Sequence, residues 1–480
     1  MSADDAARAR HLAQRLARMV RIPTITPDGG PLGPQDARVF AELRALLAEL
    51  YPRTWAAAEV DVVGRAGLLL RVPGGASAAR GATALGPVVL MAHQDVVPAP
   101  REGWADAGWS HDPFVGAITG GTGDTDDLTV HGRGTLDDKG ALLVTLEAVE
   151  DLLAAGWRPD ADLWILLGAD EERDGPSAAA AVDLLRSRGV RPALVIDEGG
   201  AVVTGAFPGL RRPMAAVGVA EKGVVTLEVV VDGDPRRAAH ASTPPRRGVV
   251  AALGRALEAL ERRPHPAVVD DVTVAMFDAV APHVPAPLGA LLRRAGTLRT
   301  ALARVLPLLG GEIAAMVRTT TTPTVLRGSA APNVIAARAS AVVNMRVATS
   351  SSVAEATAHV ERVVRRAVGR GGPGGHGGPT ASVRVLEASE PTPASPLDDE
   401  RWALVSDAVT HAYPDAVVAP YTMLAVSDAR HVARIADAIY RFSPLRMTAA
   451  QRASIHGVDE QVAASSLVAG VRFYTRLLQG

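Results

Sequence analysis

The chain has 480 residues, a formal net charge of −2 and no cysteine. Its length predicts more than one domain, because single hydrophobic cores stop growing at about 250–300 residues. The near-zero charge argues against a nucleic acid or an anionic membrane as a partner. The lack of cysteine excludes disulfides, thiolate metal sites and a cysteine nucleophile, so any metal ion must be held by His, Asp and Glu.

The N-terminal stretch MSADDAARARHLAQRLARMV has the charged, amphipathic pattern of a helix. It lacks the basic segment, apolar core and cleavage site of a signal peptide. No run elsewhere in the sequence is apolar enough to span a bilayer. We therefore expect a cytoplasmic protein with no membrane partner.

The first 200 residues alternate between helical and strand-like patterns. Helical spacing of apolar residues marks the segments 5–21, 35–50, 141–153 and 177–188. A β-branched run at 60–72 predicts a pair of strands, and three continuous apolar runs have the length of fully buried strands: Val88–Met91, Asp162–Gly168 and Ala193–Ile196. This alternation is typical of an α/β fold with a doubly wound, mainly parallel sheet.

From about residue 222 the pattern becomes that of a smaller α+β domain. Its predicted strands and helices are 224–231, 249–262, 334–347, 352–368 and 382–386. Past Pro391 the α/β character returns, with a helix near 398–412 and a terminal helix. We predict a larger discontinuous domain, residues 1–221 and 391–480, interrupted by an inserted domain at 222–390. An Arg- and Leu-rich helical stretch, 282–322, has no predicted place in this division.

Some polar side chains are given no functional role. The stretch 119–127 holds Asp124, Asp126 and Asp127 and could be a calcium loop. A polar turn is the preferred interpretation, because no glutamate completes a twelve-residue ligand set. Three histidines without supporting context are assigned to the surface: His111, His131 and His376.

Metal-binding side chains stand where the predicted buried strands end. Functional groups of parallel sheets gather at the carboxyl ends of strands. Imidazole and carboxylate donors suit zinc, which is preferred, and also cobalt or manganese. We predict two divalent metal ions held by five residues: His93, Asp137, Glu172, Asp197 and His456.

Two ions about 3.5–4 Å apart need a shared carboxylate, and Asp137 is predicted to bridge them because it leads the loop that feeds a helix. It precedes a helix, so a helix cap is the simpler alternative. His93 and Asp197 would complete the ligands of one ion, and Glu172 and His456 those of the other. His93 and His456 could otherwise be a strand-end and a surface histidine.

Two further acids lie beside these donors. Asp95 is predicted to orient the imidazole of His93 and to raise its basicity. Glu171 is predicted to be the general base for the water between the ions. The alternative for Glu171 and Glu172 is a solvated helix start, where acids are favoured.

Seven segments of the chain carry a resemblance to a known family: MAHQDVVP (91–98), GRGTLDDKG (132–140), ADEE (169–172), VIDEGG (195–200), AHASTPP (239–245), APNVI (331–335) and IHGVDE (455–460). In this order they resemble the co-catalytic zinc peptidase family, which includes aminoacylase, carboxypeptidase S, carnosine dipeptidase, glutamate carboxypeptidase and succinyl-diaminopimelate desuccinylase. VIDEGG and a further segment, GVAEKG (218–223), are most similar to the carboxypeptidase S and N-acyl-amino-acid hydrolase branch.

The resemblance implies that the inserted domain is a lid, which in this family often forms a homodimer contact. It also implies a cis peptide bond between Asp137 and Asp138. His240 matches a lid histidine that polarises the scissile carbonyl, commonly across the dimer interface. Asn333 and Arg346 resemble lid residues that hold the substrate and its free carboxylate. His240 and Arg346 could instead be a surface histidine and a strand-edge arginine paired with an acid.

The segment MLAVSDARH (423–431) departs from the family pattern. Asp428 and Arg430 match it and are predicted to bind substrate. Ala425 and Val426 replace its small, flexible part. We therefore expect a substrate pocket that is narrower or more apolar than in relatives.

We predict a two-metal amidohydrolase of carboxypeptidase or dipeptidase type, which cleaves small peptides or N-acyl amino acids that bear a free carboxylate. Lid closure is expected to exclude water and bring His240 into place. The main alternative is an N-acyl-amino-acid hydrolase or synthase of the aminoacylase type, with a fatty or aryl acyl group. An inactive, metal-holding binding protein is less favoured because binding alone has no use for Glu171. A structural metal is disfavoured because structural zinc sites are usually closed and Cys-rich.

Overall fold

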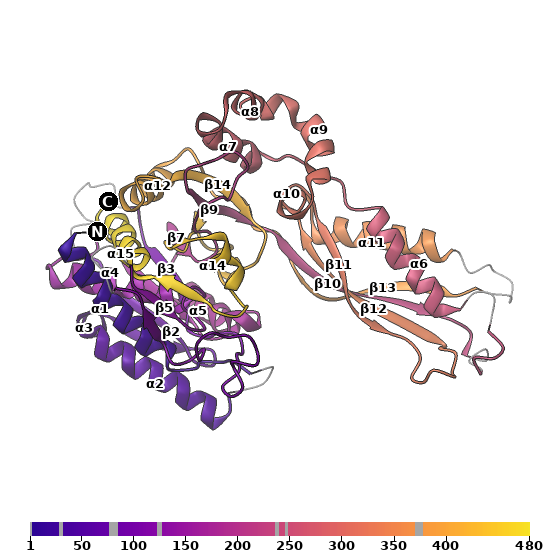
Figure 1. Ribbon diagram of the computed structural model, residues 1–480, viewed down its shortest axis with the longest axis horizontal. Helices are drawn as coiled ribbons and strands as arrows, with labels where there is room; N and C mark the ends of the chain where they lie inside the picture. The colour runs from indigo at the N-terminus through magenta and orange to yellow at the C-terminus, as the bar shows by residue number, and fades with distance from the viewer. Residues whose placement is uncertain are drawn as a thin grey trace.

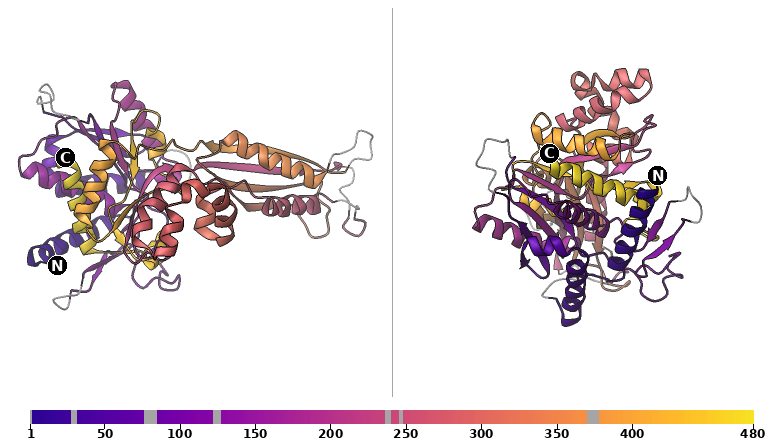
Figure 2. Two further views of the ribbon diagram at one scale, coloured as in Figure 1. Left: turned by 90° about the horizontal axis from the view of Figure 1, so that it is seen from above. Right: turned by 90° about the vertical axis from the view of Figure 1, so that its left-hand side faces the viewer.

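The computed structural model shows a larger body that holds both chain ends and an arm that extends from it (Figure 1). Seen from above, the arm is long and narrow (Figure 2). His376, Asp124 and Asp126 lie outside the described residues, so the calcium-loop alternative concerns residues that are not described. The structure describes residues 2–27, 32–75, 85–121, 127–235, 240–244, 248–369 and 378–480.

The larger body is built on a ten-stranded sheet whose central strands are parallel. Apart from His93, Asp197 and Arg441 at their carboxyl ends, these strands are apolar, as in a sheet covered on both faces, and all six residues of LWILLG in β6 are buried. In spatial order the strands are β1 (Glu59–Val63), β2 (Gly67–Val72), β6 (Leu163–Gly168), β3 (Val88–His93), β7 (Leu194–Asp197), β15 (Ile439–Arg441), β9 (Met214–Glu221), β8 (Val202–Val203) and β16 (Arg446–Met447), with β14 (Val417–Met423) also paired to β9.

Helices cover both faces of this sheet, as the sequence predicted. Leu146 and Phe473 belong to the core on one face, and Trp164 and Leu185 to the core on the other. No helix among the described residues is both long and apolar enough to cross a lipid bilayer. The first face carries α1 (Ala3–Val20), α2 (Pro34–Leu50), α3 (Pro52–Ala57), α4 (Lys139–Ala154), α12 (Glu400–Ala412) and α15 (Ala464–Gln479), and the second α5 (Pro176–Ser187) and α13 (Ala429–Val432).

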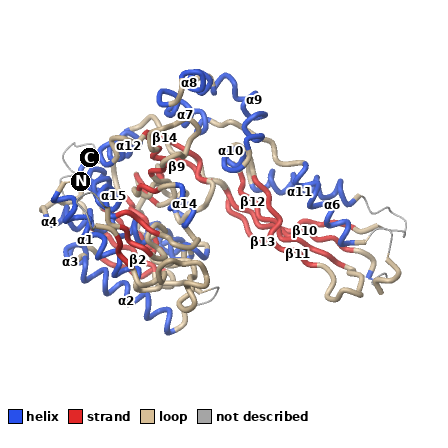
Figure 3. The backbone as a smooth tube through the Cα atoms, viewed as in Figure 1, coloured by secondary structure: helices blue, strands red, loops and turns tan. Residues whose placement is uncertain are grey.

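The arm is a four-stranded antiparallel sheet with two helices on one face (Figure 3). Alternate residues of β10 from Val225 to Val231 pack against these helices, as the two-residue period of a strand requires. The strand predicted at 334–347 begins at Arg338 instead. The elements are β11 (Thr320–Arg327), β12 (Arg338–Val347), β10 (Gly223–Asp232) and β13 (Thr380–Ser389), with α6 (Val249–Arg262) and α11 (Val353–Val368).

The helical stretch that had no predicted place packs on the larger body, not on the arm sheet. Leu292 and Ala295 of this stretch share a core with Val417 and Ala419 of β14, as do Met276 and Phe277 of the helix that precedes it. In Figure 1 this helical segment arches over β9 and β14. With the preceding helix, it consists of α7 (Asp271–Val280), η4 (Ala281–His283), α8 (Ala286–Leu292), α9 (Ala295–Val305), η5 (Leu306–Leu309) and α10 (Gly311–Met316).

A three-stranded antiparallel sheet joins the C-terminal region to the loop before α4. Gln461 pairs with His131, and the Gly132 N–H donates to the Glu460 carbonyl at 2.9 Å. The segment 455–460 is therefore held beside the segment 132–140. The elements are β4 (Ala117–Thr119), β5 (Thr129–His131) and β17 (Gln461–Ala463), preceded by the short helix α14 (Ala449–Ser454).

Candidate active site

Asp137 lies between two imidazoles that come from opposite ends of the chain. His93 Nε2 is 2.9 Å from Asp137 Oδ1, and His456 Nε2 is 2.9 Å from Asp137 Oδ2. His456 Nε2 is also 3.1 Å from Glu172 Oε1. The peptide bond between Asp137 and Asp138 is cis, as the resemblance implied. One carboxylate thus turns one oxygen to each histidine.

The carboxylates dominate the electrostatics of this cluster. Burial opposes ionisation of Asp137, but hydrogen bonds from His456 and His93 hold its pKa well below its usual range. Burial alone would lower the pKa of His93, yet hydrogen bonds with Asp137 and Asp95 raise it well above its usual value. Hydrogen bonds with Asp137 and Glu172 raise the pKa of His456 to about 10. The cluster therefore stabilises positive charge on both sides of Asp137.

The structure differs from the sequence prediction at the end of β7. Asp197, a predicted metal ligand, is 2% exposed, and its Oδ2 accepts a hydrogen bond from the Ala429 N–H at 2.8 Å. The next residue, Glu198, brings its Oε1 to 3.8 Å from His93 Nε2. Successive side chains along a strand point to opposite sides, so a shift of one residue exchanges the two acids. We correct the candidate ligand from Asp197 to Glu198.

Asp95 connects His93 to the loop that carries the paired glutamates. Its Oδ1 lies 3.3 Å from His93 Nδ1. Its two carboxylate oxygens accept hydrogen bonds from the backbone N–H groups of Glu171 and Glu172, each at 3.2 Å. Asp95 is fully buried. A carboxylate in this position fixes both the ring orientation and the glutamate loop.

Glu171 lies within reach of the cluster, because ligand atoms of His93, Glu171 and Glu172 lie within 4.8 Å of one another. Burial raises the pKa of Glu171 well above its usual range, and the nearby carboxylates of Asp428 and Asp137 add to this while His93 opposes it. An acid whose pKa is raised in this way can hold a proton closer to neutral pH, as a general base and acid must.

The donor chemistry of the cluster fits metal ions. Imidazole nitrogens and carboxylate oxygens, without thiolates, suit zinc, cobalt or manganese. A carboxylate with one oxygen toward each of two imidazoles is what a bridging ligand requires. Among the described residues, three groups of donors lie close enough to hold an ion: His93, Asp138 and Glu198; His93, Glu171 and Glu172; and Asp137, Glu172 and His456.

Glu460, to which the sequence analysis gave no role, supports the loop that carries Asp137. Its Oε1 accepts hydrogen bonds from the N–H groups of Leu136 and Asp137, at 2.8 and 3.1 Å. Its Oε2 accepts from the Gly134 N–H at 3.1 Å and from the Arg133 guanidinium at 2.5 Å. An acid four residues after the last histidine was the sequence signal. Glu460 positions Asp137 through the backbone.

Two arginines that were predicted to bind substrate lie at the junction of arm and body. Arg346 has a buried Nη1 with no hydrogen-bond partner in the described structure, and burial followed by Arg430 lowers its pKa. Arg430 Nη2 is 3.9 Å from Asp174 Oδ1. Burial, with Arg346 and Arg318, also lowers the pKa of Lys222 to about 8. The junction is therefore cationic and suits a carboxylate.

Asp428, the other predicted substrate contact in this segment, is instead a buried acid. It is 3% exposed, and neither carboxylate oxygen has a hydrogen-bond partner in the described structure. A Cβ added to Gly175, whose φ is 62°, would lie 1.9 Å from Asp428 Oδ1. Burial and the charges of Asp197 and Asp95 raise its pKa well above its usual range. The loop that carries Glu171 and Glu172 thus covers Asp428. We therefore correct the prediction that Asp428 contacts the substrate.

His240 and Asn333 lie together at the far end of the arm. His240 forms an isolated antiparallel bridge with Val334, and the Ala241 N–H donates to the Asn333 carbonyl at 2.9 Å. Both side chains are exposed. The ten residues of β10 separate this end from the body, a span of roughly 30 Å. The structure does not bring either residue to the Asp137 cluster of the same chain.

Similar sequences cover almost the whole chain. A model of the peptidase family M20/M25/M40 matches residues 89–480. The chain is 30% identical over 475 residues to the N-fatty-acyl-amino acid synthase/hydrolase PM20D1 of Xenopus tropicalis, which covers 98% of this chain and 86% of that protein. It is 29% identical over 477 residues to the probable carboxypeptidase S-like 2 of Dictyostelium discoideum, and the match covers 98% of this chain and 84% of that protein.

Solved structures show the same fold at low identity. The M20 family metallo-carboxypeptidase Sso-CP2 from Sulfolobus solfataricus has a TM-score of 0.66 and 14% identity, with 98% of each chain covered. Human carnosine dipeptidase 1 has a TM-score of 0.63 and 15% identity, with 99% of this chain and 98% of that chain covered. The predicted fold class, with a large mainly parallel sheet and a small antiparallel sheet, is confirmed. The chain belongs to the peptidase family M20/M25/M40 and is a hydrolase that acts on amide bonds.

Proposed function

We propose that the chain is a two-metal hydrolase of N-acyl amino acids. The observation that carries this proposal is the position of Asp137, with one oxygen 2.9 Å from His93 Nε2 and the other 2.9 Å from His456 Nε2. Glu198 stands on the His93 side, and Glu172 on the His456 side. Zinc is the proposed metal, because these donors suit it, and cobalt or manganese could take its place.

Bound metal ions would supply Lewis-acid polarisation of the substrate carbonyl and a water of lowered pKa. Glu171 would take the proton of the attacking water and then deliver it to the nitrogen of the leaving amine. The raised pKa of Glu171 supports this role, since the carboxyl must hold the proton between the two steps. Asp95 keeps Glu171 in place through its backbone N–H.

The cationic junction is the proposed site of the substrate carboxylate. Arg346 has a buried guanidinium nitrogen without a partner in the described structure, and Arg430 lies near it. A guanidinium binds a carboxylate with two parallel hydrogen bonds. Relatives named as N-fatty-acyl-amino acid synthase/hydrolases favour an N-acyl amino acid as the substrate. A small peptide with a free carboxylate is the second candidate, which the carboxypeptidase S-like relative supports.

We also propose that the working unit is a homodimer formed through the arm. His240 and Asn333 lie at the far end of the arm, roughly 30 Å of strand away from the body of their own chain. A second copy could place these residues beside the first copy's Asp137 cluster. The partner subunit's His240 would then donate a hydrogen bond to the carbonyl oxygen under attack.

An activity screen tests the proposal. The purified protein, loaded with zinc, cobalt or manganese, would be assayed on dipeptides and on acetyl and long-chain N-acyl derivatives of one amino acid. We expect faster turnover of the N-acyl amino acids. Glu171→Gln should lower the rate by about 10²–10⁴-fold, with unchanged metal content. Equal rates for the wild type and Glu171→Gln, or no turnover with any of the metals, would remove the enzymatic assignment.

A further inference from the structure

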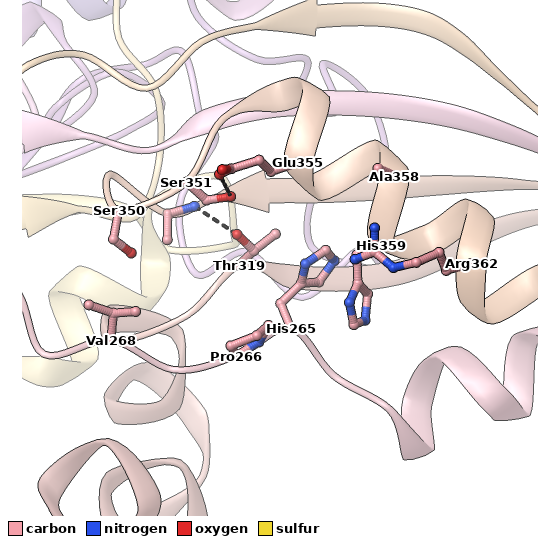
Figure 4. A pocket seen from close by; sticks show the side chains of 11 residues that line it. His265, Pro266, Val268, Thr319, Ser350, Ser351, Glu355, Ala358, His359 and Arg362 are labelled. Atoms are coloured by element: carbon pink, nitrogen blue, oxygen red, sulfur yellow. Dashed lines mark hydrogen bonds between the residues drawn. The ribbon is translucent and has the colours of Figure 1, made fainter. Parts of the chain in front are cut away.

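A pocket separate from the candidate active site lies where the arm meets the linker to α7 (Figure 4). Its volume is about 390 Å³. The linker after α6, with His265, forms one side, and α11, with His359 and Arg362, forms the adjoining side. Thr319 at the start of β11 and Ser350 in the turn before α11 complete it. The pocket therefore spans segments that join the arm to the rest of the chain.

His265 presents a buried nitrogen that has no partner. The residue is 7% exposed, and its Nε2 makes no hydrogen bond in the described structure. Its ring lies against the ring of His359, with the centroids 4.2 Å apart. His359 Nε2 is 2.9 Å from the Arg263 carbonyl, so this nitrogen of His359 is already occupied. Buried polar atoms are normally paired, so the free Nε2 of His265 favours a ligand that pairs with it.

The charges around the pocket are positive. The guanidinium of Arg362 is exposed and forms no hydrogen bond or ion pair within the described part of the chain. Burial, followed by His359, Arg362 and Lys222, lowers the pKa of His265 to about 4. The ring is therefore neutral at pH 7, and its surroundings are cationic.

The acid on the pocket wall is already engaged. Glu355 Oε2 accepts hydrogen bonds from the Ser352 N–H at 3.2 Å and from the Ser351 hydroxyl at 3.1 Å, in the capping box of α11. It is the one acid among the described residues that line the pocket. A metal ion in this pocket would thus be repelled by positive charge and would find one carboxylate, which is already hydrogen-bonded. An anion would find hydrogen-bond donors that have no partner in the described part of the chain.

We propose that this pocket binds a small oxyanion, through the guanidinium of Arg362 and the Nε2–H of His265. Arginine suits this task because it binds phosphate or carboxylate oxygens with two parallel hydrogen bonds. A ligand held by α11 and by the linker restrains the arm relative to α7, which packs on β14.

Calorimetric titration of the metal-loaded full chain tests this site. One series uses inorganic phosphate and a second uses acetate, at constant ionic strength. Whichever anion binds identifies phosphate or carboxylate as the ligand chemistry. Arg362→Gln should weaken its binding by at least about tenfold, because a charge-assisted pair is lost. Arg366→Gln is the matched control, since Arg366 lies one turn along α11 and outside the pocket. His265→Phe keeps an aromatic ring against His359 but removes the N–H donor, and should also weaken binding by about tenfold.

Hydrogen exchange locates the bound anion. We expect slower exchange in segments 263–268 and 350–362 when the anion is added. Equal affinity of Arg362→Gln and Arg366→Gln would overturn the proposal. Slower exchange confined to the loops 91–98, 132–140 and 169–175 would also overturn it, because the anion would then occupy the metal cluster. Absence of binding by both anions would have the same consequence.

Discussion

At the scale of single residues, Asp197 at the end of β7 and Glu198 directly after it have different surroundings. Glu198 faces His93, whereas Asp197 accepts a hydrogen bond from the Ala429 N–H. We expect Glu198→Ala to retain about one metal ion per chain in place of about two. Asp197→Asn should retain both, because its amide oxygen can still accept the backbone hydrogen bond. Elemental analysis after dialysis measures the metal content of each variant. Loss of metal in Asp197→Asn but not in Glu198→Ala would restore Asp197 as the ligand.

His265 predicts a pH dependence of stability. Its pKa falls from 6.5 to about 4 in the folded chain, through burial and then His359, Arg362 and Lys222. The folded state thus binds this proton less readily than the unfolded state does. The contribution of the neutral His265 ring to the free energy of unfolding is therefore complete above pH 6.5 and is lost as the pH falls toward 4. The Tm of His265→Asn, relative to that of the wild type, should therefore rise as the pH is lowered from 6.5 to about 4.

The matched control for this pH series is His283→Asn, because His283 is exposed on η4. Its Tm should keep a constant offset from wild type at every pH. A constant offset for His265→Asn as well would show that burial of the neutral ring has no effect on stability.

The role of a side chain could be predicted from the sequence where a predicted strand leads into a metal-binding residue. It could not be predicted where the packing of distant segments decides which side chain faces the cluster. His93 and Glu172 stand at strand ends, and the structure brings both to the Asp137 cluster. The choice between Asp197 and Glu198 depends on which of two successive side chains turns toward His93, and the sequence has no signal for that. Asp428 is covered because the glutamate loop closes over it, a contact between segments far apart in sequence.

At the scale of elements, α7 is held to the larger body by apolar packing. Phe277 is 3% exposed and lies in the core that includes β14. Phe277→Ala should lower the free energy of unfolding by about 3–5 kcal/mol. Leu308→Ala in the same helical segment, at a side chain 81% exposed, should change it by less than about 0.5 kcal/mol. Denaturant unfolding compares them, and equal effects would contradict this packing.

Elements with strong local patterns could be predicted, and those that depend on distant contacts could not. The apolar run of β6 and the amphipathic pattern of α6 match the structure closely. β9 is fully buried but is rich in alanine and glycine, which have low strand propensity, and it was not predicted as a strand. Residues 320–322 were assigned to a helical stretch, yet they begin β11 because they pair with β12.

At the scale of the whole molecule, the length of the arm predicts that two copies share each active site. His240 lies at the end of the arm away from the body. His240→Ala and Glu171→Gln should each be inactive alone. Refolded together in equal amounts, they should recover roughly a quarter of the wild-type activity, because half of the dimers are mixed and each mixed dimer has one intact site. Assays of the mixture measure this recovery, and no recovery would place His240 in its own chain's site or outside catalysis.

The central claim is that the Asp137 cluster holds two metal ions. Anomalous diffraction from crystals grown with zinc, recorded on both sides of the zinc absorption edge, tests this directly. The account predicts two zinc peaks about 3.5–4 Å apart, one beside His93 and Glu198 and the other beside Glu172 and His456, with Asp137 between them. A single peak, or peaks only elsewhere in the molecule, would contradict it.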